Sequence, residues 1–131
     1  MTPKELMDEA KEATKKSHAP YSNFHVGAAL LTEDGKIYQG ANIETSSYSL
    51  TICAERTALF SAFIQGERKF KAIAITSDQA AYCPPCGACR QVLLDLCGKD
   101  LDVILLDKET PKVYKISELL PHSFGEEFLN K

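Results

Sequence analysis

The chain has 131 residues and a mass of 14.4 kDa, which is the size of one ordinary domain. Hydrophobic residues make up 44% and charged residues 25%, a balance typical of a globular protein rather than of a disordered chain. The formal charge is −3, so bulk electrostatics do not indicate a nucleic-acid partner. No apolar run approaches the roughly 18 residues of a membrane span. We therefore expect a single domain over residues 1–131 and no membrane partner.

The first segment has the pattern of a capped helix. Thr2 is suited to cap it, Pro3 suits its first position, and Glu5 follows three residues after the cap. Apolar residues then recur at helical spacing, and we expect the helix to end before residues 19–20. The segment is charged and lacks the apolar core of a signal peptide, so we also expect a cytoplasmic location.

Strands and helices alternate along the rest of the chain. The elements predicted after the first helix are two strands, a helix, a strand, a helix and two strands, over residues 25–32, 36–42, 52–65, 72–75, 87–97, 103–106 and 112–116, with a last helical turn. Asp34 and Gly35 are a strong hairpin signal between the first two strands, and Gly98 ends a helix. Alternation favours crossover connections, whereas the hairpin makes the sheet mixed. We predict a three-layer α/β/α sandwich around a mixed, mostly five-stranded sheet.

Five cysteines are the unusual count in the composition. An odd number fits a disulfide framework poorly, and in a reducing compartment clustered cysteines are more often metal ligands or redox groups. Cys53, Cys86 and Cys89 lie where loops turn into predicted helices, whose N-termini stabilise thiolates. Cys86 and Cys89 are three residues apart, so both can face one metal ion. Cys83 and Cys97 are more typical of packing residues.

Three thiolates on zinc leave one tetrahedral position for a non-protein ligand, which is typical of a catalytic site. A water at that position becomes a nucleophile near neutral pH. Glu55 lies two residues after Cys53, where it is poorly placed as a ligand but could carry protons between that water and a substrate nitrogen. The excess negative charge of three thiolates could be offset by a guanidinium of Arg56 or Arg90 that donates to sulfur. We assign most of that role to Arg56.

The sequence resembles the zinc-dependent cytidine deaminases, in particular the small homotetrameric kind with three cysteine ligands. The resemblance rests on the segments 53–56 and 85–91, and extends to residues 21–30, 40–44 and 119–124, so it covers nearly the whole chain. It implies a cytidine deaminase-like fold over the single domain and one zinc ion per subunit on the three cysteines of the first two segments. The chain differs from the common pattern at Pro84, where a serine is usual, but the ligand spacing is unchanged.

The resemblance also implies a hydrolase of pyrimidine salvage. It converts cytidine and 2′-deoxycytidine to uridine and 2′-deoxyuridine, with zinc-bound hydroxide attacking carbon 4 and Glu55 as the proton shuttle. The implied substrate-binding residues are Phe24, Asn42, Glu44, Ala54 and Phe124. Among them, Asn42 and Glu44 bind ribose hydroxyls, and Phe124 stacks on the base from a neighbouring subunit. The implied partners are therefore a small-molecule nucleoside, water and other copies of the chain, without nucleic acid.

Several alternatives stay open from the residues. A deaminase for a nucleoside antibiotic of the blasticidin S type shares the second cysteine segment. A structural zinc module would need a fourth ligand, for which Cys83 is the nearby candidate, and a thiol redox protein would use Cys83 with Cys86. A polynucleotide deaminase is disfavoured by the short, acidic chain. From the pattern alone, Phe24 would be strand core and Phe124 part of an apolar docking face.

Overall fold

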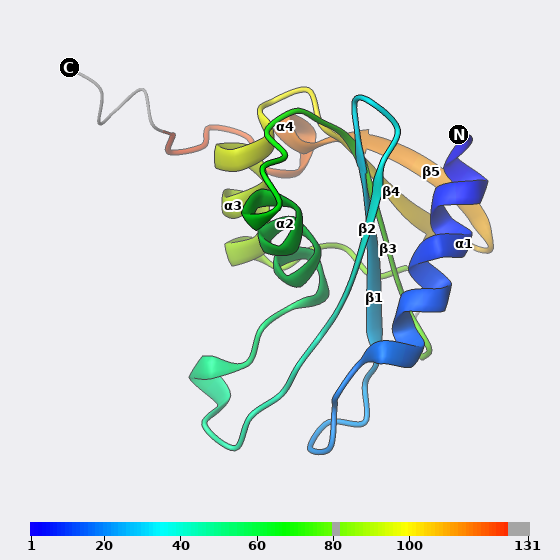
Figure 1. The fold of residues 1–131 in the computed structure, drawn as a ribbon, viewed down its shortest axis with the longest axis vertical. Coiled ribbons are helices and arrows are strands. Elements are labelled where there is room, and N and C mark those ends of the chain that lie inside the picture. Colours follow the sequence, from blue (N-terminus) through cyan, green and yellow to red (C-terminus); the bar gives the residue numbers. More distant parts are fainter. Residues whose placement is uncertain (80–81, 126–131) are drawn as a thin grey trace.

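The computed structural model describes residues 1–79 and 82–125, whose elements form three layers (Figure 1). The elements are α1 (Pro3–Ala13), the 3-10 turn η1 (Thr14–Lys16), β1 (Val26–Thr32), β2 (Ile37–Ala41), the 3-10 turn η2 (Tyr48–Leu50), α2 (Ala54–Ile64), β3 (Phe70–Ser77), α3 (Gly87–Cys97), β4 (Asp102–Asp107), β5 (Thr110–Lys115) and α4 (Ile116–Leu119). Helix α1 covers one face of the sheet, and α2 and α3 cover the other. The predicted α/β/α sandwich is confirmed. No helix in the described part of the chain is long and apolar enough to cross a membrane.

The sheet has five strands in the order β2-β1-β3-β4-β5. Strands β3 and β4 are parallel and are joined by the crossover helix α3, whereas the other neighbours are antiparallel. The mixed sheet is therefore as predicted. The β1–β2 hairpin turns through Gly35, whose φ of 94° favours glycine, and Thr32 N–H donates to the Lys36 carbonyl at 2.9 Å. The hairpin brings both strand ends back to the edge of the sheet where the cysteine segments lie.

Alternate residues of the central strands fill two separate cores. On β1, Ala28 and Leu30 pack toward α2 and α3, whereas Ala29 and Leu31 pack toward α1. The same alternation continues on β3 and β4, because successive side chains of a strand point to opposite faces. Full burial of one leucine side chain is worth about 1.5–3 kcal/mol. This double burial explains why the strand sequences are apolar without interruption.

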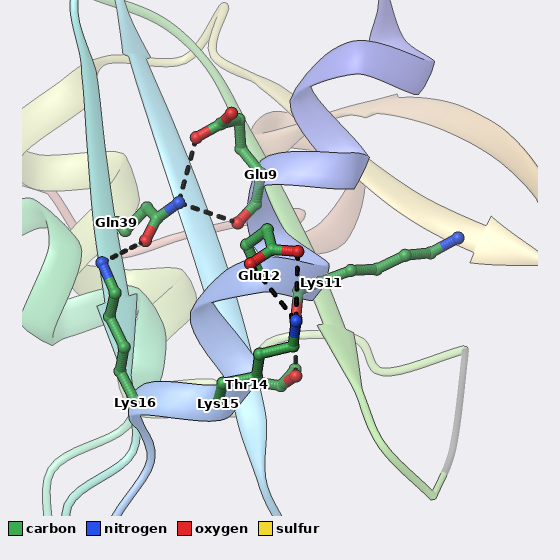
Figure 2. A network of polar contacts seen from close by, with 7 residues as sticks. All are labelled: Glu9, Lys11, Glu12, Thr14, Lys15, Lys16 and Gln39. Atoms are coloured by element: carbon green, nitrogen blue, oxygen red, sulfur yellow. Dashed lines mark hydrogen bonds and ion pairs between the residues drawn. The ribbon is translucent and has the colours of Figure 1, made fainter.

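Helix α1 is held at both ends. The predicted cap is present: Thr2 N–H donates to Glu5 Oε1 at 2.9 Å, and Glu5 N–H donates to Thr2 Oγ1 at 3.1 Å. At the other end, Gln39 on β2 donates to Glu9 Oε1 at 3.0 Å and accepts from Lys16 (Figure 2). These contacts fix the turn η1 against β2, and with it the residue that follows, Ser17.

Helix α2 packs directly on the backbone of β2. A Cβ atom at Gly40 would lie 2.4 Å from the Ala54 carbonyl oxygen and 2.4 Å from Ala58 N, so only glycine fits. The predicted start of this helix at residue 52 is wrong, because α2 begins at Ala54. Ile52 instead pairs with Ile43 through two backbone hydrogen bonds of 3.0 Å. This pairing delivers the chain to the helix N-terminus with Cys53 as its cap residue.

Candidate active site

Three thiols meet where two helices begin. Cys53 and Cys86 are the N-cap residues of α2 and α3, and Cys89 lies in the first turn of α3. Because both helices cover the same face of the sheet, their N-termini converge. The three sulfur atoms lie within 4.8 Å of one another, and the Cys53 and Cys86 Sγ atoms are 3.9 Å apart. Neither N-cap thiol is used to cap its own helix.

The spacing of the thiols suits zinc. Sulfur atoms at about 2.3 Å from one zinc ion in tetrahedral geometry lie about 3.8 Å apart, close to the Cys53–Cys86 separation of 3.9 Å. Donation from the Cys89 thiol, together with that from Arg56, lowers the pKa of the Cys53 thiol to about 5. The positive ends of two helix dipoles act in the same direction. The donor set therefore fits a soft cation that three thiols can hold.

Two arginines follow the ligand segments, and they have different partners. Arg56 Nη2 donates to Cys53 Sγ at 3.4 Å, and its Nε is buried without an acceptor among the described residues. Arg90 instead donates from Nε to the Pro85 carbonyl and from Nη1 to the Leu119 carbonyl, both at 2.8 Å. Arg90 thus ties the ligand loop to α4, and the contact with sulfur comes from Arg56.

Glu55 lies in the first turn of α2, and the residue is 5% exposed. Burial raises the pKa of its carboxyl to about 7. A carboxyl with a pKa near neutrality can both take and release a proton at neutral pH. Its position in the wall of the cavity beside Cys53 and Cys86 makes this chemistry available to a bound molecule.

A cavity of about 240 Å³ opens at the thiols. Its walls are formed by Phe24, Val26, Asn42, Thr51, Ile52, Cys53, Ala54, Glu55, Cys83, Pro84 and Cys86. Of the substrate contacts that the resemblance implied, Phe24, Asn42 and Ala54 are in these walls, whereas Glu44 and Phe124 are not among them. A wider surface hollow of about 480 Å³, lined by charged residues, lies at the hairpin end of β1, away from the thiols.

Several wall residues were not assigned from the sequence. Val26 lies within residues 21–30, which carried the resemblance, and Thr51 and Ile52 come just before residues 53–56, so proximity in the sequence was the available signal. Cys83 also lines the cavity but stands outside the three-thiol group. Burial raises the pKa of Cys83 to about 11. Burial likewise raises the pKa of Cys97 to about 12, as expected of a packing residue.

Glu44 is held by the loop that precedes β1. Its Oε1 accepts from the backbone N–H groups of Tyr21 and Ser22, each at 3.1 Å, and its Oε2 accepts from the Ser22 hydroxyl. Hydrogen bonding from Ser22 lowers the pKa of Glu44, so the carboxylate is ionised at neutral pH. Strand β2 ends at Ala41, but backbone pairing continues beyond it, and Glu44 N–H donates to the His18 carbonyl at 2.8 Å.

Phe124 lies on the surface, with 57% of the residue exposed. Its carbonyl accepts from Gln91 Nε2 at 2.8 Å. Gln91 and its neighbour Arg90 therefore both hold the segment after β5, one at Phe124 and the other at Leu119. The two residues that follow Cys89 thus connect the thiol cluster to the C-terminal part of the described chain.

A three-thiol cluster at the helix N-termini of an α/β/α sandwich, beside a buried carboxyl, defines a zinc-dependent enzyme with one coordination position for a non-protein ligand. Residues 1–104 match the family model described as the cytidine and deoxycytidylate deaminase zinc-binding region. The chain belongs to this cytidine and deoxycytidylate deaminase family, and zinc is its metal.

Full-length relatives agree with the family match. The chain is 50% identical over 127 residues to the cytidine deaminase of Halalkalibacterium halodurans, covering 95% of this chain and 96% of that protein. It is 47% identical over 131 residues to the cytidine deaminase of Sporosarcina psychrophila, covering 99% and 96%. The crystal structure of cytidine deaminase from Burkholderia pseudomallei superimposes with a TM-score of 0.90 at 48% identity, covering 95% of this chain and 100% of that one.

Proposed function

We propose that the protein is a hydrolase that deaminates cytidine and 2′-deoxycytidine to uridine and 2′-deoxyuridine. The observation that carries the proposal is the cavity whose walls contain two of the three clustered thiols together with the buried carboxyl of Glu55. Relatives that are similar over nearly their whole length carry the name cytidine deaminase. The thiols and the carboxyl are what hydrolysis at an amino-bearing ring carbon needs.

The chain's own residues divide the chemistry between holding zinc and moving protons. Held by Cys53, Cys86 and Cys89, zinc supplies a Lewis acid that makes a hydrolytic nucleophile available near neutral pH. Glu55 takes a proton from the attacking water and gives it to ring nitrogen 3. The water oxygen bonds to carbon 4 as this first proton moves. Glu55 then takes the remaining proton from that oxygen and gives it to the amino group. The bond between carbon 4 and the amino nitrogen breaks, ammonia leaves, and carbon 4 keeps the oxygen as a carbonyl.

The substrate is oriented by residues around the same cavity. We place Phe24 and the backbone of Ala54 at the base, and Asn42 and Glu44 at the sugar. Phe24, Asn42 and Ala54 already line the cavity. Glu44 follows Asn42 by two residues and is ionised, so it can accept a hydrogen bond from a sugar hydroxyl.

We further propose a homotetramer in which Phe124 reaches the cavity of a neighbouring copy. Two observations support this: the ring is largely exposed, and Phe124 is not in the wall of the cavity of its own chain. Its backbone is nevertheless held by Gln91, so the ring is presented from a fixed point. We propose that the catalytic unit is a single domain over residues 1–131. A cytoplasmic location suits a site built from thiolates.

The test is turnover by the purified, zinc-loaded protein. We expect cytidine and 2′-deoxycytidine to yield uridine, 2′-deoxyuridine and ammonia, and both to be better substrates than blasticidin S. Preferential turnover of blasticidin S would move the protein to the antibiotic deaminases. No turnover of either nucleoside by protein with one zinc per chain would contradict the proposal.

A further inference from the structure

The side-chain amide of Asn42 is held in one orientation by backbone groups. Its Oδ1 accepts from Val26 N–H at 2.9 Å, and its Nδ2 donates to the Phe24 carbonyl at 2.8 Å. A backbone N–H can only donate and a carbonyl can only accept. These two partners therefore identify which end of the amide is oxygen and which is nitrogen, without reference to any neighbouring side chain.

This orientation sets the direction of the next two hydrogen bonds. Ser17 Oγ lies 2.6 Å from Asn42 Oδ1, and because that oxygen is an acceptor, the single hydroxyl hydrogen of Ser17 must point to it. Ser17 Oγ then has only lone pairs to offer His25 Nδ1, which lies 2.9 Å away. Nδ1 of His25 must therefore carry a hydrogen. The chain of donation runs from His25 through Ser17 to Asn42.

Ser17 is held in place for this contact by its neighbours. The turn η1, just before it, is anchored to Gln39, and His18 N–H donates to the Asn42 carbonyl at 3.0 Å. The backbone of the segment that carries Ser17 is thus paired with the backbone that carries Asn42. Ser17 and Asn42 meet through tertiary structure, 25 residues apart in the sequence.

The consequence is a restriction on what Asn42 can offer a ligand. Both lone pairs of Oδ1 are occupied, by Ser17 and Val26, while Nδ2 uses one of its two hydrogens on Phe24. The side chain of Asn42 can therefore still donate one hydrogen bond, but its oxygen cannot accept another. Glu44, an ionised carboxylate two residues later, can only accept. A donor and an acceptor so close in the chain are complementary to sugar hydroxyls, which can both accept and donate.

We propose that Ser17 and His25 are positioning residues. They keep the side-chain oxygen of Asn42 occupied as an acceptor, so that Asn42 acts only as a hydrogen-bond donor to a sugar hydroxyl of the nucleoside. The proposal rests on the proposed nucleoside substrate. Hydrogen bonds in a chain polarise one another, so donation from His25 through Ser17 also strengthens the remaining N–H of Asn42 as a donor. Their loss should weaken recognition of the sugar and leave the chemistry at the base intact.

The first test needs no substrate. Nitrogen-15 NMR of the zinc-loaded protein reports which ring nitrogen of each histidine carries a hydrogen, and the His25 signals are assigned by their loss in His25→Asn. We expect Nδ1 of His25 to be protonated. A neutral ring with its hydrogen on Nε2 alone would contradict the proposed chain of donation, whatever the enzyme turns over.

The second test compares two nucleosides in the zinc-loaded enzyme. For Ser17→Ala we expect the KM for cytidine to rise about three- to tenfold, the loss expected for one hydrogen bond, with kcat nearly unchanged. For 2′,3′-dideoxycytidine, which lacks both ring hydroxyls, KM or its inhibition constant against cytidine should be the same in variant and parent. An equal loss with both nucleosides, or no change with cytidine, would overturn the proposal.

Two further variants separate donation from packing. His25→Asn keeps an amide N–H near the position of Nδ1 and should preserve the KM for cytidine, whereas His25→Leu should raise it as Ser17→Ala does. If Ser17→Ala does not fold, the KM values of His25→Asn and His25→Leu for the two nucleosides provide the same test. Ser61→Ala, an exposed serine on α2, is the matched control and should change neither constant. If the parent enzyme does not turn over cytidine, the proposed function fails, and the NMR result still decides the direction of donation.

Discussion

Arg56 Nη2 lies 3.4 Å from Cys53 Sγ, one helical turn away along α2. The contact places a positive group against a cluster that becomes net negative when three thiolates bind one zinc ion. Hydrogen bonds to ligand sulfurs both orient the ligands and draw charge from them. Arg90 donates to two backbone carbonyls instead, so Arg56 is the arginine that supports the ligand sulfur.

The first prediction concerns zinc affinity. Arg56→Ala should fold but bind zinc about 10–100-fold more weakly, the usual effect of removing a group that supports a metal ligand. Competition with a chromophoric chelator measures this directly, and turnover should fall as well. Arg68→Ala removes an arginine that contacts the Phe63 carbonyl and ring, and it serves as the control. Unchanged zinc affinity and turnover in Arg56→Ala would show that the contact with Cys53 has no role in the site.

The second prediction concerns the proton shuttle. Glu55→Gln preserves shape but cannot exchange a proton, so kcat should fall by about 10²–10⁴-fold, the usual contribution of a general acid–base group. Zinc content should stay at the parent value. Glu33→Gln, which alters an exposed carboxylate on the hairpin, is the matched control. Loss of zinc from Glu55→Gln would mean that Glu55 is a ligand, and retained turnover would remove it from the mechanism.

The third prediction separates Cys83 from the three clustered thiols. Cys83→Ser should keep zinc and turnover, because Cys83 stands outside the group of three converging sulfur atoms. Cys89→Ser should lose zinc, because it removes one of three donors that lie within 4.8 Å of one another. Elemental analysis of the two purified variants gives the answer. Zinc lost from Cys83→Ser would support a four-cysteine structural site in place of a catalytic one.

The fourth prediction concerns sharing of the site between copies. Phe124→Ala and Glu55→Gln should each be strongly impaired alone. If Phe124 acts on a neighbouring copy, tetramers assembled from both variants by co-expression contain sites with an intact Glu55 from one chain and an intact Phe124 from another. Random assembly would restore about a quarter of the sites. Activity no higher than the sum of the two separate variants would place Phe124 on its own chain or outside the site.

The fifth prediction concerns the packing that positions α2. Gly40→Ala would push a methyl group to within 2.4 Å of the backbone of α2, so the free energy of unfolding should fall by about 1–3 kcal/mol or more. Gly87→Ala adds the same methyl group where no atom lies within 4 Å and should change stability by less than about 0.5 kcal/mol. Urea unfolding of both variants with zinc bound measures the difference. Equal stability of the two would contradict the close approach of α2 to β2.

The sequence allowed the layers of the fold to be predicted because their signals are local. The capping residues Thr2 and Glu5, the hairpin at Gly35 and the uninterrupted apolar strands each act within a few residues, and all appear in the structure. The start of α2 could not be predicted in this way. Ile52 has the spacing of a helical residue, but its pairing with Ile43 across a loop outweighs that tendency.

The candidate site likewise contains features that local sequence predicts and features that depend on tertiary structure. Cys53, Cys86 and Cys89 could be selected from spacing and residue chemistry, and the structure brings their sulfurs together. The contact of Arg90 with Leu119 and that of Ser17 with Asn42 join segments that are 25 or more residues apart, and no local pattern indicates them. Hydrogen bonds of this kind become visible only after the chain has folded.

The most direct test of the account is a zinc titration followed by turnover of cytidine. Protein stripped of metal by a chelator is given increasing zinc, and uridine and ammonia are measured at each ratio. We predict no turnover without zinc and a rise to a plateau at one zinc per chain, because three thiols form one metal site. Full turnover in the stripped protein, or no turnover at one zinc per chain, would contradict it.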